Sequence, residues 1–128
     1  MCKLLSTHFP KHRLILSDFY KLPDTIEGIN GPVVQTRYRG NMVPCSTFRV
    51  QPGWFDIFFP TNFELLKKIY THTRKTAASA GGSYDSEEPV VLTQGEFVTK
   101  YADLSKTKTR SGENPMSMLY ENNKFILT

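Results

Sequence analysis

The sequence predicts an α+β fold, with a mainly antiparallel sheet and two amphipathic helices packed on one face of it. Short apolar runs separated by proline, glycine and asparagine turns fill the first half of the chain. Two later segments repeat apolar residues at helical spacing, and a last apolar run closes the sequence. Strands grouped together, rather than alternating with helices, favour antiparallel pairing. At 128 residues, we expect residues 1–128 to form a single domain.

The expected strands are short and bounded by turn residues. In residues 33–39, Val34, Thr36 and Tyr38 fall on one face and two arginines on the other, as in a half-buried strand. Pro44 indicates an edge, and residues 54–59, apolar on both faces, indicate a central strand. The full set of expected strands is 13–20, 33–39, 47–50, 54–59, 90–92, 116–120 and 125–127, the last two forming a hairpin.

Two helices are predicted from capping signals. Thr61 precedes Glu64, and Thr93 precedes Glu96, by the three positions of a capping box. The first helix should cover residues 62–76 and the second should run to about residue 105. Between them, residues 77–89 are small, polar and then acidic, so we expect a flexible loop. The expected core consists of Leu16, Val34, Phe48, Phe55, Ile57, Leu66, Ile69, Phe97, Tyr101 and Phe125.

Net charge and cysteine content limit which partners and which cellular compartment we expect. The net charge is +4, which permits contact with nucleic acid, an anionic membrane or an acidic protein and requires none of them. Cys2 and Cys45 are too few and too far apart for a disulfide framework, so we expect reduced thiols in a cytoplasmic protein. The sequence contains no run of about 18 apolar residues, so no membrane-spanning helix and no membrane partner are expected.

The segment 37–59 interleaves arginines with aromatic residues, a combination that suits phosphate contacts and base stacking. Our first hypothesis is a non-enzymatic module that binds single-stranded or shape-read nucleic acid. The same aromatics could equally fill a core, with the cations forming an ordinary solvated face. The residues expected to bind nucleic acid are Arg37, Arg39, Arg49 and Trp54, together with the polar face of the first helix, Lys67, Lys68, Arg74 and Lys75.

Two alternatives belong to other classes of protein. An assembly or adaptor subunit, of a larger complex or a viral particle, would use Trp54, Phe58 and Phe59 as interface anchors, and a homo-oligomer is compatible with it. A small enzyme would need Cys45 and His72 to meet in the fold. No C-x-x-C, H-E-x-x-H, G-x-x-x-x-G-K-[ST] or G-x-G-x-x-G spacing is present, so we expect no metal site and no cofactor.

Overall fold

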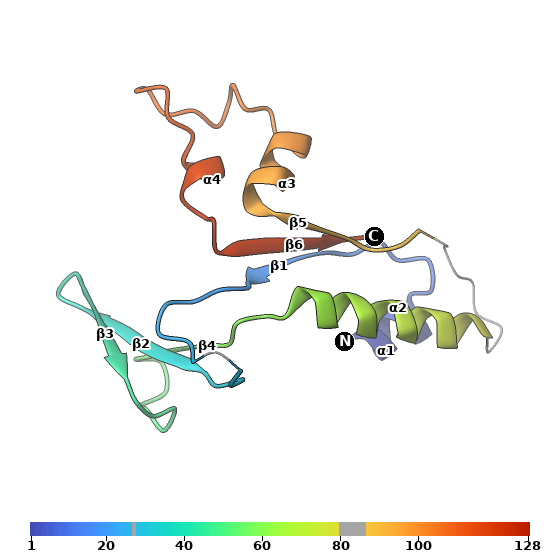
Figure 1. The fold of residues 1–128 in the computed structure, drawn as a ribbon, viewed down its shortest axis with the longest axis horizontal. Helices are drawn as coiled ribbons and strands as arrows, with labels where there is room; N and C mark the ends of the chain where they lie inside the picture. The colour runs from blue at the N-terminus through green and yellow to red at the C-terminus, as the bar shows by residue number, and fades with distance from the viewer. Residues whose placement is uncertain (27, 80–86) are drawn as a thin grey trace.

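The computed structural model describes residues 1–26, 28–79 and 87–128 and confirms the α+β class (Figure 1). All strand pairs in this part of the chain are antiparallel. They form two sheets of three strands rather than one sheet. In chain order the elements are α1 (Cys2–His8), β1 (Ile15–Phe19), β2 (Val33–Tyr38), β3 (Asn41–Cys45), β4 (Asp56–Phe58), α2 (Phe63–Ser79), β5 (Val90–Thr93), α3 (Gln94–Tyr101), α4 (Pro115–Met118) and β6 (Asn123–Leu127).

The first sheet has the order β1-β6-β5, so the last strand of the chain lies in its centre. Helix α2 lies on one side of this sheet and α3 and α4 on the other (Figure 1), so the helices do not share a face as expected. Ile126, in the middle of β6, is 0% exposed. Phe125 points to the opposite face, where its ring stacks on Phe97 with the centroids 3.9 Å apart. The core therefore lies on both faces of β6.

The second sheet has the order β3-β2-β4 and projects away from the helices (Figure 1). Strands β2 and β3 form a hairpin in which Tyr38 pairs with Asn41. The two turn residues, Arg39 and Gly40, have φ values of 48° and 86°, as a type I′ turn requires. Within the three strands of this sheet, only Val33 and Val34 are buried.

Helix α2 packs against α1 and against the segment that follows α1. Helix α1 was not predicted from the sequence. Tyr70 of α2 is buried and its hydroxyl is hydrogen-bonded to Nε2 of His12. The other ring nitrogen, Nδ1, faces the carbonyl oxygen of Phe9. Because a carbonyl only accepts, we assign the proton to Nδ1, and Nε2 then accepts from Tyr70. The segment after α1 is thereby fixed to the middle of α2.

The two expected capping boxes have different outcomes. At α3 the box forms: the Thr93 hydroxyl accepts from the N–H of Glu96, and the Glu96 carboxylate accepts from the N–H of Thr93 at 2.7 Å. At α2 it does not form, because Asn62 caps the helix by accepting from the N–H of Leu65 at 3.0 Å. Thr61 turns instead to β1, where its N–H donates to the carbonyl of Phe19.

Several local predictions differ from the structure. Residues 47–50 form no strand, and β4 is an edge strand rather than a central one. Residues 115–118 are helical, so β6 has no hairpin partner there and pairs with β1 and β5. Helix α3 ends at Tyr101, and α2 continues to Ser79, into the segment expected to be a loop. Most of the remainder of the expected loop, residues 80–86, lies outside the described residues.

The predicted core is partly confirmed. Val34 is buried, and the expected core residues that are half-buried are Leu16, Phe55, Leu66, Phe97 and Phe125. Those that are exposed are Phe48, Ile57, Ile69 and Tyr101. Of these four, Phe48 lies in the loop after β3, Ile57 in the edge strand β4, and Ile69 and Tyr101 on helices α2 and α3. None of the helices in the described ranges is long and apolar enough to cross a lipid bilayer.

Candidate functional site

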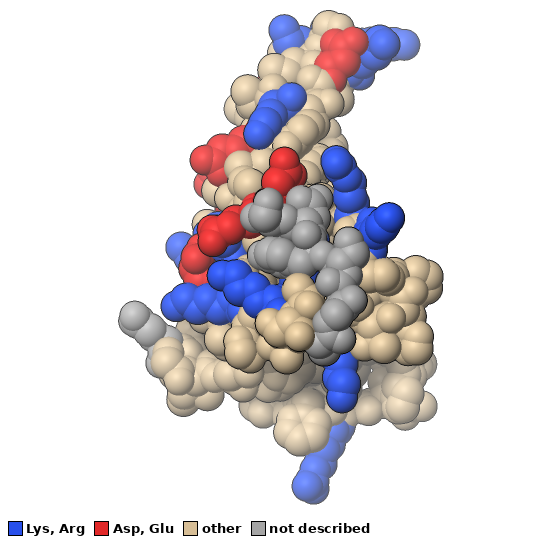
Figure 2. Space-filling view, turned by 90° about the vertical axis from the view of Figure 1, so that its right-hand side faces the viewer, with Lys and Arg blue, Asp and Glu red and all other residues tan. Residues whose placement is uncertain are grey.

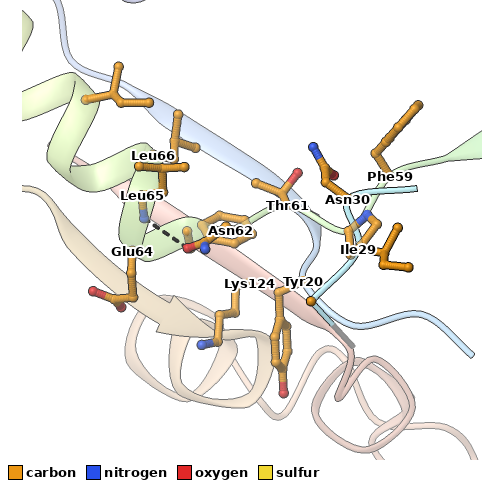
Figure 3. A pocket seen from close by; sticks show the side chains of 14 residues that line it. Tyr20, Ile29, Asn30, Phe59, Thr61, Asn62, Glu64, Leu65, Leu66 and Lys124 are labelled. Atoms are coloured by element: carbon orange, nitrogen blue, oxygen red, sulfur yellow. Dashed lines mark hydrogen bonds between the residues drawn. The ribbon is translucent and has the colours of Figure 1, made fainter. Parts of the chain in front are cut away.

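An open cleft of about 840 Å³, which we call the α2 cleft, lies where α2 begins (Figure 3). Three connecting segments meet there: the end of β1, the loop that leads into β2, and the link from β4 to α2. Lys124 of β6 contributes from the first sheet. The lining residues are Tyr20, Gly28, Ile29, Asn30, Phe59, Pro60, Thr61, Asn62, Phe63, Glu64, Leu65, Leu66, Ile69 and Lys124.

The cleft is held in place by hydrogen bonds between segments far apart in the sequence. Thr61 is fixed to β1 twice, through its N–H to the Phe19 carbonyl and through its hydroxyl to Oδ2 of Asp18. Asn62 is fixed by its role as the α2 cap. The position of the cleft therefore follows from the start of a helix docked against a sheet edge.

Among the described residues that line it, the α2 cleft has one acidic and one basic side chain. Lys124 places its Nζ 4.4 Å from the ring centroid of Tyr20, a cation–π contact that orients both groups at the cleft wall. Glu64, in the first turn of α2, is exposed, and its carboxylate is available to a molecule in the cleft. Four further lining residues are large, apolar and about half exposed, and they come from the loop before β2, from the link between β4 and α2 and from α2 itself. We call this set the apolar wall, and it consists of Ile29, Phe59, Leu65 and Ile69.

The arginines and the tryptophan expected to bind nucleic acid lie on the second sheet and its loops, and all are exposed. Trp54 is 72% exposed and lines a shallow hollow with Arg37 and Tyr38. Arg39 lies in the hairpin turn, with its guanidinium 5.3 Å from the Tyr38 ring centroid. Arg49 is exposed in the loop after β3. The structure thus brings Arg37 and Trp54 into one hollow.

The predicted basic face of α2 is divided between two sides of the helix. Lys67, Lys68 and Lys75 line one groove, in which Nζ of Lys67 lies 3.9 Å from a Glu88 carboxylate oxygen. Arg74 is only 6% exposed, and its guanidinium lies 5.5 Å from the Tyr70 ring centroid. Arg74 is therefore part of the packing of α2 and does not belong to its solvated face.

The basic groups do not converge on one surface. Figure 1 places the hairpin of β2 and β3 and the second half of α2 at opposite ends of the molecule. Figure 2, which views the end where α2 finishes, has acidic side chains interspersed among the basic ones. The same separation keeps Cys45 of β3 away from His72 of α2, so the cysteine–histidine pair that the alternative of a small enzyme requires is not formed. No group of three metal-ligating side chains occurs in residues 1–26, 28–79 and 87–128.

Sequence reasoning missed the α2 cleft because no periodic pattern marks it. Tyr20 and Asn30 come from separate connections and Lys124 from strand β6, and the three are far apart in the sequence. The only local signal was the start of α2, and the capping interpretation assigned Thr61 and Glu64 to each other. In the structure Thr61 bonds to β1, which leaves the Glu64 side chain at the cleft.

A family model described as "Putative S-adenosyl-L-methionine-dependent methyltransferase" matches residues 1–81. A search of curated proteins and a search of solved structures each returned no match. The family match corrects the expected function: a non-enzymatic binding module, for nucleic acid or as an adaptor, conflicts with membership of an enzyme family. The comparisons likewise give no support for binding of nucleic acid.

S-adenosyl-L-methionine does not fit a complete site in the described residues. Nucleoside cofactors are often held at the carboxyl ends of parallel strands, beside a glycine-rich turn, but the strands described here pair only antiparallel. In the described ranges, the buried polar side-chain atoms that have no partner are Ser6 Oγ and Asn114 Oδ1, and neither lines the α2 cleft. The cleft is large enough for such a molecule, but it is open, and the charged groups among its described lining residues are one carboxylate and one lysine, which do not make a complete site for an adenosine and a charged amino-acid group together.

Proposed function

The chain belongs to this methyltransferase family, and we propose that it takes part in methyl transfer by forming the acceptor-side wall of the reaction cleft. The observation that carries the proposal is the position of the α2 cleft. All of its lining residues except Lys124 fall within residues 1–81, the segment that the family model matches. The segment that defines the family is therefore the segment that builds the cleft.

The cleft suits an acceptor molecule that combines an apolar part with a hydrogen-bond donor. Pro60 and Leu66, half-buried lining residues outside the apolar wall, would cover the apolar part and exclude water from it. At the start of α2, the Glu64 carboxylate would accept a hydrogen bond from the donor and so orient it. The Lys124 ammonium, held over Tyr20, would limit how deeply the acceptor enters. Together these groups bind and orient, which is the contribution we assign to this chain.

A cytoplasmic location is a proposal of the same kind. Cys2 and Cys45 are both free thiols, and both are half-buried. Reduced cysteines are the rule in reducing compartments and rarer outside them. Alkylation of the two thiols in freshly lysed cells, without added reductant, would support this location. Thiols that react only after reduction would contradict it.

The test of the proposed function uses the tagged protein purified natively from its source cells. We would incubate it with S-adenosyl-L-methionine carrying a tritiated methyl group and with an extract of the same cells as acceptor. We expect tritium transfer above background, and Glu64→Gln should lower the rate at limiting extract about tenfold while saturating extract restores it, because a charged hydrogen bond is lost. The matched control, Glu113→Gln, changes an exposed carboxylate outside the cleft and should leave the rate unchanged.

Two results would contradict the proposal. Absence of tritium transfer by the native protein would remove the enzymatic function. Equal rates for Glu64→Gln and the native protein at limiting extract would keep the function and remove the α2 cleft as the acceptor site.

A further inference from the structure

We propose that the apolar wall and the outer edge of β1 form one docking surface for a second polypeptide unit, and that this unit carries the S-adenosyl-L-methionine site. The inference rests on the proposed function, since it names the partner that a methyl transfer by this chain requires. It starts from a mismatch: the family implies a cofactor for which the described residues form no complete site.

The exposed area of the chain is larger than a self-contained protein of this size would have. The accessible surface is 9680 Å² for a mass of 14.7 kDa. Folded monomers of that mass expose about 6,900 Å², so the excess is about 2,700 Å². Eight fully extended residues expose only about 1,100 Å², so the residues outside the described ranges cannot account for the excess. The remaining area, about 1,600 Å², matches one partner's share of an obligate interface.

Part of this surface is the apolar wall of the α2 cleft. Phe59 is 50% exposed, and Ile29, Leu65 and Ile69 are exposed to a similar extent. Four large apolar side chains grouped along one cleft are unusual on a protein that works alone, where such residues are scattered singly. Lys124 and Glu64 lie beside them and give the patch a polar rim. An apolar centre with a polar rim is the usual build of a protein interface.

The outer edge of β1 continues the same surface. Strand β1 pairs with β6 on one side only. Residues 14 and 20 make backbone hydrogen bonds toward the β6 side, so by alternation Ile15, Ser17 and Phe19 direct their N–H and C=O groups outward. The carbonyl of Phe19 is taken by Thr61, which lines the α2 cleft. The edge at Ile15 and Ser17 therefore leads directly into the cleft and can accept a further strand.

Because the described residues form no complete cofactor site, the chemistry of the cofactor indicates which kind of unit binds the docking surface. A second copy of this chain would cover apolar area but would repeat the same described residues, which form no complete cofactor site. A unit with a cofactor-binding α/β sheet would supply the absent site, and a strand at the edge of that sheet would pair with β1. One occupant would then cover the apolar wall, pair with the open edge of β1 and supply the cofactor site.

The experiment compares three variants of the tagged protein, purified natively from its source cells. Phe59→Asp places a carboxylate in the apolar wall, and Ser17→Pro removes an outward N–H while leaving the bonds to β6 in place. Phe48→Asp is the matched control, because Phe48 is also an exposed phenylalanine, at 62%, but lies outside the proposed surface. Circular dichroism and thermal unfolding verify that each variant folds.

Two readouts follow from the same preparations. Light scattering after size exclusion gives the mass of the assembly and its dissociation with dilution. Ultraviolet cross-linking with tritiated S-adenosyl-L-methionine, followed by peptide sequencing, locates the cofactor. We expect label on peptides outside residues 1–128, association about 100-fold weaker for Phe59→Asp and about tenfold weaker for Ser17→Pro, and no change for Phe48→Asp.

Each contrary result overturns the inference. Label on residues 1–128 would place the cofactor site in this chain. A monomer, an assembly of identical copies, or an assembly that all three variants leave intact would remove the docking surface. The proposed function can fail separately from the docking surface. An assembly that binds the cofactor but transfers no methyl group would support the docking surface and contradict the proposed function. Methyl transfer by a monomer would support the function and contradict the docking surface.

Discussion

The two sheets have the same number of strands and the same antiparallel pairing, yet only the first is covered by described helices on both faces. In the first sheet, β6 is covered from both sides, and Ile126 is fully buried. The second sheet projects away from the described helices (Figure 1), and Phe48 and Trp54, in the loop between β3 and β4, remain exposed. The comparison teaches that alternation of apolar residues marks a strand, whereas burial depends on whether another element reaches that strand.

The largest expected effect contrasts the centre of the first sheet with the loop that joins β3 to β4 in the second. Ile126→Ala should lower the free energy of unfolding by about 3 kcal/mol, because it removes a fully packed side chain and leaves a cavity. Trp54→Ala removes a larger side chain but one that is mostly in water, so it should cost less than about 0.5 kcal/mol. Urea unfolding followed by circular dichroism measures both. A Trp54→Ala cost equal to that of Ile126→Ala would mean that the second sheet is packed against something in solution.

The next effect concerns the helix that covers the first sheet. Tyr70→Phe removes the hydroxyl that bonds to Nε2 of His12 and leaves that part-buried nitrogen without its partner. We expect a loss of about 1.5 kcal/mol. Tyr38→Phe, the control on the second sheet, removes an exposed hydroxyl and should change the stability by less than about 0.3 kcal/mol. Equal losses for the two variants would show that the α1–α2 contact does not stabilise the fold.

The fold class could be predicted from the sequence because it depends on local patterns. The capping box at Thr93 and the alternation in residues 33–39 are local, and both elements form where expected. The errors arise where distant segments compete for a residue. Thr61 had a correct capping pattern, but Asp18, which is 43 positions away, takes its hydroxyl, and Asn62 then caps α2.

The candidate site was largely beyond sequence reasoning for the same reason. The α2 cleft is formed by three connections and one strand, and no spacing along the chain brings Tyr20 and Lys124 together. The basic residues were visible in the sequence, but their separation in space was not. Arg74 illustrates the limit, since helical periodicity placed it on the solvated face and contact with Tyr70 buries it.

A smaller effect tests the turn of the second sheet. Arg39 adopts φ 48°, a left-handed conformation that asparagine tolerates better than arginine. Arg39→Asn should therefore stabilise the β2–β3 hairpin by about 0.5 kcal/mol, seen as slower hydrogen exchange in β2 and β3. Exchange in β6 should be unchanged, because the substitution lies in the other sheet. Faster exchange in the hairpin would mean that the contact of Arg39 with the Tyr38 ring outweighs the backbone strain.

The smallest effect is the pH dependence of the capping box at the first sheet. The N–H and hydroxyl of Thr93 donate to the Glu96 carboxylate and hold its pKa below the ordinary value of 4.5. Since the folded pKa is the lower one, the stabilisation is complete above pH 4.5 and is lost as the pH falls through the folded pKa. Glu96→Gln cannot titrate, so urea midpoints should fall less for this variant than for the native protein over that acid range. Hydrogen exchange in α3 should respond and exchange in the β2–β3 hairpin should not, because only the covered sheet depends on this cap.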